Sequence, residues 1–139
     1  MEKNNIEKNP ITPNQINQLN NYDVFVFGSN LSGIHGAGAA KKAMEFGAVW
    51  GKGDGWYGKT YAIPTKSLNI ERTLRIDEIK PYVDVFIKRA KESIDYTFFV
   101  TEIGCGLAGY KPKDIAPLFK DAIGIKNISL PKSFINLIK

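Results

Sequence analysis

Residues 22–47 read YDVFVFGSNLSGIHGAGAAKKAMEFG, and their pattern gives the clearest indication of the fold. The apolar run at 24–27 is rich in β-branched and aromatic residues, which is typical of a strand buried on both faces of a sheet. A loop with three glycines follows, and then an alanine-rich segment of high helix propensity that ends at Gly47. The stretch predicts a strand, a glycine-rich loop and a helix in succession.

The same order returns later in the chain. Residues 96–103, YTFFVTEI, predict a second buried strand, which opens into the glycine loop GCGLAGY at 104–110. A helix is expected from Asp114 to Gly124, and an earlier one over 77–93. The apolar stripes of these two helices are Ile115, Leu118, Phe119 and Ala122, and Ile79, Val83, Phe86, Ile87 and Ala90. Strands that alternate with helices predict an α/β fold with a mixed, largely parallel central sheet.

The remaining segments carry weaker signals. Thr12 followed by Pro13 is typical of a capped helix start, with Ile16 and Leu19 on one face. Residues 48–59 are expected to form an irregular loop and 60–64 a short strand that ends at Pro64, while 67–76 fit either a strand or a loop. Residues 127–131 and 132–139 predict a last strand and helix.

The length of 139 residues suits one domain, expected over 12–139, after a flexible arm at 1–11 that is rich in Asn, Lys and Glu. The chain has no apolar run near the roughly 18 residues that span a bilayer and no signal-peptide pattern at its start, so a cytoplasmic protein without membrane contact is expected. One cysteine and one histidine argue against a disulfide framework and a bound metal.

The net charge of +5 favours an anionic partner. The basic residues are scattered rather than gathered in a stripe, which argues against nucleic acid. Residues 53–60, GDGWYGKT, match the Walker A pattern, but a strand-like segment follows where a phosphate loop needs a helix. Gly33, Gly36 and Gly38 also have the wrong spacing for a dinucleotide fingerprint. Neither an NTPase nor a hydride-transferring enzyme is favoured.

Two glycine loops at the ends of two apolar strands indicate an anion site. In an α/β sheet, ligands lie at the carboxyl ends of parallel strands, where exposed backbone N–H groups hold anions. If the two strands run the same way, both loops face one elongated anion such as a diphosphate. The alternative, that the glycines only make tight crossings, stays open at this point.

Three segments, GAGAAKKAMEFG, IPTK and VTEIGCGLAG, resemble the macrodomain superfamily. They are most similar to the branch of terminal ADP-ribose-protein glycohydrolases and ADP-ribose 1''-phosphate phosphatases. The resemblance implies a three-layer α/β/α fold and binding of ADP-ribose or a related nucleotide diphosphate, or of an ADP-ribosylated protein, with no cofactor. The binding positions it implies are Ser29, Asn30, Gly36, Ala37, Gly38, Gly104, Cys105, Gly106, Leu107 and Ala108. Neighbouring candidates in the same loops are Gly33, His35, Gly109 and Tyr110.

The resemblance also implies a catalytic role for Lys66, since the glycohydrolases use a lysine in a similar segment as a nucleophile. The aspartate that follows G-C-G-L in those enzymes is Ala108 here, so Glu102, Asp54 or His35 would have to supply a proton-transfer group. Cys105 has only one histidine in the chain as a candidate base, and its small size explains its place between two glycines. Binding of ADP-ribose is therefore expected first, a Lys66-dependent hydrolase second, and a basic adaptor for nucleic acid or protein last.

Overall fold

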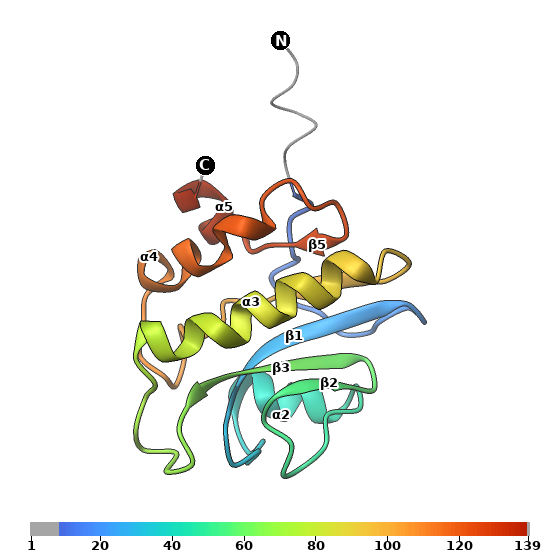
Figure 1. Cartoon of the computed structure of the whole chain (residues 1–139). Coiled ribbons are helices and arrows are strands. Elements are labelled where there is room, and N and C mark those ends of the chain that lie inside the picture. The colour runs from blue at the N-terminus through green and yellow to red at the C-terminus, as the bar shows by residue number, and fades with distance from the viewer. Residues whose placement is uncertain (1–8, 139) are drawn as a thin grey trace.

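The computed structural model describes residues 9–138, which form an α/β fold around a five-stranded sheet (Figure 1). The strand order is β2-β3-β1-β4-β5. β1 pairs in parallel with β3 and β4, β4 pairs in parallel with β5, and β2 runs antiparallel to β3. The strands are β1 (Asp23–Asn30), β2 (Gly55–Tyr57), β3 (Thr60–Lys66), β4 (Thr97–Val100) and β5 (Ile128–Ser129). The predicted mixed, mostly parallel sheet is confirmed.

Helices cover both faces of this sheet. They are α2 (Gly38–Met44), α3 (Ile76–Glu92), α4 (Pro112–Ile115), the 3-10 helix η1 (Ala116–Ala122) and α5 (Lys132–Ile138). Side chains alternate along a strand, so β1 sends Val24 and Val26 into the core under α3 and η1. Phe25 and Phe27 point to the other face, where α2 packs. Figure 1 shows α3 and α2 on opposite sides of β1.

The two predicted amphipathic helices are present, with one change. All five residues of the stripe in α3 are buried, as are the four apolar residues predicted on the later helix. That later helix is split into α4 and the 3-10 helix η1. Pro117 has no N–H to continue the α-helical ladder at this point, which accounts for the change in helix type.

The predicted helix after Thr12 is wrong. Residues 12–20 form no helix, and the N–H of Thr12 donates to the carbonyl of Leu130 (2.9 Å), which ties the start of this segment to the end of β5. Ile16 and Leu19 still pack against the core, on the face that holds Phe25. The packing of these two side chains against the core therefore does not require a helix.

The expected flexible arm at 1–11 does not extend to residue 11. The side-chain amide of Asn9 donates to the carbonyls of Ala122, Ile125 and Ile128, and its oxygen accepts from the N–H of Gly124. Residues 9–11 therefore belong to the folded domain. The rest of the expected arm, residues 1–8, lies outside the described residues.

The hairpin of β2 and β3 differs from expectation in two ways that affect the pocket. Residues 55–57 form a strand inside the segment expected to be an irregular loop, and β3 runs through Pro64 to Lys66. β2 pairs only with residues 60–62 of β3, so Pro64 lies beyond the hairpin and is paired with β1 alone, opposite Ser29. This extension places Lys66 at the carboxyl end of β3. The ambiguous segment after it is a loop that leads into α3.

Candidate functional site

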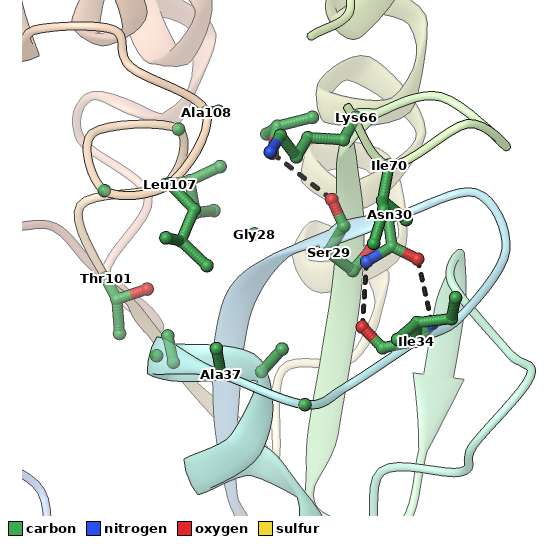
Figure 2. Close-up of a pocket in the computed structure, with 18 of the residues that line it drawn as sticks. Gly28, Ser29, Asn30, Ile34, Ala37, Lys66, Ile70, Thr101, Leu107 and Ala108 are labelled. Carbon is green, nitrogen blue, oxygen red and sulfur yellow. Dashed lines mark hydrogen bonds between the residues drawn. The ribbon is translucent and has the colours of Figure 1, made fainter. Parts of the chain in front are cut away.

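The two glycine loops meet at one pocket of about 450 Å³. β1 lies between β3 and β4, and because all three run in parallel their carboxyl ends share one edge of the sheet. Figure 2 shows Ala37 of the first loop opposite Leu107 of the second. Ten of the predicted site residues line the pocket: Ser29, Asn30, Gly36, Ala37, Gly38, Lys66, Gly104, Gly106, Leu107 and Ala108.

Gly36 and Gly106 are glycines that the fold itself does not require. Neither has a positive φ, and a Cβ added at either position would meet no heavy atom of the structure within 4 Å. Their backbone therefore faces open space in the pocket, one glycine in each loop. Gly28 lies between the loops, where an added Cβ would come within 3.3 Å of the backbone nitrogen of Gly104. Close approach of the two strand ends explains that third glycine.

The polar side chains of β1 that line the pocket are already bonded within the protein. The hydroxyl of Ser29 donates to the carbonyl of Gly53. The amide of Asn30 donates to the carbonyl of Ile34 and accepts from its N–H, both at 2.8 Å, as the dashed lines of Figure 2 show. These two residues shape the loops. The groups left for a ligand are chiefly backbone N–H groups of the loops and the side chains that lie outside β1.

His35 does not line the pocket. It is 2% exposed, and its Nε2 lies 3.1 Å from the carbonyls of Val49 and Lys52. Its ring packs edge-on against Phe27 and Trp50. The histidine therefore joins the first glycine loop to the segment 48–54, which is a structural role rather than the ligand contact or the proton transfer considered from the sequence.

Cys105, Gly109, Tyr110 and Gly33 also lie outside the pocket lining. The hydroxyl of Tyr110 donates to the carbonyl of Leu74 (2.5 Å), so this ring braces the second loop. Burial, with smaller contributions from the negative charges of Glu102 and Asp114, raises the pKa of the Cys105 thiol to about 11. A thiol with such a pKa stays protonated at neutral pH and is a poor nucleophile.

Lys66 and Glu102 are the ionisable residues in the pocket lining, as far as the structure describes it. Glu102 follows β4, and its Oε2 accepts a hydrogen bond from the hydroxyl of Ser133 (2.6 Å). Of the three groups that could replace the missing aspartate, Glu102 alone reaches the lining, whereas Asp54 and His35 do not. Burial raises the pKa of Asp54, while the charge of Arg89 opposes that shift.

Several lining residues were not predicted. Thr65 and Thr101 lie at strand ends, and this position could have identified them as lining residues. The hydroxyl of Thr65 donates to the carbonyl of Ser29, and that of Thr101 donates to the carbonyl of Val26. Ile34 and Ile70 line the pocket with their apolar side chains, each 38% exposed. Ile70 belongs to the loop after β3, so its position depends on tertiary structure and has no signal in the sequence.

The Walker-like residues 53–60 lie in the β2–β3 hairpin and do not reach the pocket. The hydroxyl of Thr60 donates to the carbonyl of Tyr57, and Lys59 Nζ donates to the carbonyl of Leu19. A Cβ on Gly53 would lie 1.8 Å from the carbonyl oxygen of Asn30, so this glycine serves the contact with β1. The hairpin lacks the helix start that a phosphate loop requires.

Residues 9–138 contain no cluster of His, Cys, Asp and Glu side chains that could hold a metal ion. None of the helices described is both long and apolar enough to cross a membrane. The chain matches no family model, no curated protein and no solved structure. The case for a function therefore rests on the pocket.

Proposed function

We propose that this protein binds ADP-ribose or a related ADP-ribose-derived nucleotide, and that its fold is a three-layer α/β/α domain of the macrodomain type. One observation carries the proposal: Gly36 and Gly106, from separate loops, leave bare backbone facing a single pocket. Glycines that neither backbone geometry nor packing requires leave room for a ligand to approach the main chain. Exposed N–H groups in such loops are suited to the oxygens of a diphosphate.

Charge, size and lining support the same ligand. The pocket volume falls within the range of small-molecule sites, about 300–1,000 Å³. Lys66 supplies a cation for a phosphate at the end of β3. Ile34, Ile70 and Leu107 add aliphatic surface that suits the face of a base or a ribose. A nucleotide combines an anionic centre with such apolar faces.

The test is calorimetric titration with ADP-ribose, with ribose 5-phosphate and inorganic sulfate as ligand controls. Gly36→Val and Gly106→Val place side chains in the open space, so we expect each to lower affinity at least tenfold while the melting temperature changes little. Lys66→Met removes the cation from the pocket and should also lower the affinity for ADP-ribose. Lys113→Met is the matched control and should leave the affinity unchanged, because Lys113 on α4 does not line the pocket. Full affinity in both valine variants would contradict binding at this site.

A second candidate is a hydrolase that removes ADP-ribose or its 1''-phosphate. The presence of both Lys66 and Glu102 in the pocket lining favours this hydrolase. A lysine attacks only as the neutral amine, so it needs a neighbouring group that accepts and donates protons. Release of mono-ADP-ribose from a modified protein, abolished by Lys66→Ala, supports the enzyme. Heat of binding without such release supports the binder. A basic adaptor would instead show binding that falls steeply with salt and ignores ADP-ribose.

A further inference from the structure

Thr73 lies next to the pocket without lining it. It forms an antiparallel bridge with Lys66, the last residue of β3. Backbone hydrogen bonds of 2.9 and 2.8 Å between the neighbouring residues, 67 with 72 and 74 with 65, flank this pair. Side chains that are opposite each other between two such bonds lie close together on one side of the ladder. The backbone that places the cation of the pocket therefore also fixes Thr73.

The second glycine loop contains one peptide unit that is hydrogen-bonded at both ends. The N–H of Gly109 donates to the carbonyl of Gly106 (3.0 Å), which closes a four-residue turn over 106–109. The carbonyl of the same peptide unit, that of Ala108, accepts a hydrogen bond from the hydroxyl of Thr73 (2.9 Å). Ala108 lines the pocket and Thr73 does not, so this bond directs the carbonyl oxygen toward a residue outside the lining.

The backbone of this turn does not by itself fix the orientation of that peptide unit. Gly109 has φ +88°, and a Cβ added to it would meet no heavy atom of the structure within 4 Å. A glycine adopts either sign of φ at little cost, so no side chain at this position opposes rotation of the peptide unit. The hydroxyl of Thr73 is the group that holds the carbonyl in place.

We propose that Thr73 is a positioning residue for the anion site, and that its hydroxyl keeps the carbonyl of Ala108 turned away from the bound phosphates. This inference rests on the proposed function. A loop that holds an anion presents backbone N–H groups, and a carbonyl oxygen turned toward the same anion repels it through its partial negative charge. Thr73 acts on the ligand only through the second loop, because it does not line the pocket.

The experiment measures the dissociation constant of ADP-ribose by calorimetry, together with the melting temperature. Thr73→Val removes the hydroxyl and keeps the shape of the side chain, so we expect the affinity to fall about tenfold. Thr73→Ser keeps the hydroxyl and should bind within about threefold of the wild type. Thr60→Val is the matched control, because Thr60 also donates to a backbone carbonyl, that of Tyr57 (2.6 Å), but lies in the hairpin away from the lining. It should lower the melting temperature and leave the affinity unchanged.

The possible failures are distinct. If the wild type binds ADP-ribose and Thr73→Val binds it equally well, the hydroxyl has no positioning role and the proposed function stands. An equal loss of affinity in Thr73→Ser, or in Thr60→Val, assigns the effect to packing or to general destabilisation and overturns the inference. If Thr73→Val does not fold, Thr73→Ala takes its place, because it differs from Thr73→Ser only in the hydroxyl. If the wild type binds no ADP-ribose, the proposed function fails and the role of Thr73 fails with it.

Discussion

The two glycine loops around the pocket have similar compositions but are held in different ways. In the first loop, residues 31–37, the support comes from its own neighbourhood: Asn30 brackets Ile34, and His35 reaches the carbonyls of the segment 48–54. The second loop, residues 104–110, depends on a segment 35 residues earlier, since the hydroxyl of Thr73 donates to the carbonyl of Ala108 at 2.9 Å. Tyr110 adds a bond to the same segment at Leu74.

Each loop also contains a crowded glycine with a positive φ and an open glycine without one. Gly33 has φ +73°, and its added Cβ would lie 2.3 Å from the backbone of Gly51. Gly104 has φ +79°, but its Cβ would meet the end of the Ile115 side chain at 2.9 Å, which can move. Gly36 and Gly106 face open space. The comparison separates glycines that build the loops from glycines that leave room for a ligand.

The largest effect is expected from Gly33→Ala. The variant combines a left-handed backbone with a clash against main chain, so we expect the free energy of unfolding to fall by about 3 kcal/mol. Gly36→Ala is the matched control and should change stability by less than about 1 kcal/mol, because its backbone has no positive φ and the site is open. Urea denaturation measures both. Equal stabilities would mean that the first loop does not pack against residues 51–52 as described.

Smaller losses of stability are expected from the side chains whose hydrogen bonds hold the two loops, Asn30 for the first and Tyr110 for the second. Asn30→Ala leaves both backbone groups of Ile34 without their partner in a part-buried place, so we expect a loss of about 2–3 kcal/mol. Tyr110→Phe removes one hydrogen bond and keeps the ring, so about 1 kcal/mol is expected. Denaturation curves of both variants, recorded with and without ADP-ribose, give the comparison. If Tyr110→Phe costs more than Asn30→Ala, the second loop is the more dependent on a single bond.

The sequence predicts the frame of this fold better than the details of its site. The strand β1 follows from its continuous run of apolar residues, and the buried stripe of α3 follows from hydrophobic periodicity. The meeting of the loops follows from their place after two apolar strands. The use of Asn30 and His35 could not be predicted, since a polar side chain in a loop bonds whatever tertiary packing brings near. The same holds for Asn9, whose partners lie more than 100 residues away.

The last comparison concerns Cys105 of the second loop, which, like His35 of the first loop, has a side chain of a chemically reactive type. Because its pKa of about 11 exceeds the ordinary value of about 9, only about 0.1% of the thiol is ionised at pH 8, against about 10% in the unfolded chain. Alkylation by iodoacetamide at pH 8 should therefore be about a hundredfold slower in the native protein than in urea.

The sign of the linkage follows from the same shift. A raised folded-state pKa stabilises the protein below about pH 9, and this contribution is lost as the pH rises from 9 through 11. Glu102→Gln removes one of the charges that raise the pKa, so native alkylation should become faster in that variant, whereas Glu92→Gln should leave the rate unchanged. Equal alkylation rates in native and unfolded wild type at pH 8 would show an accessible thiolate. Cys105 would then be a reactive group, and the second loop, unlike the first, would carry chemistry of its own.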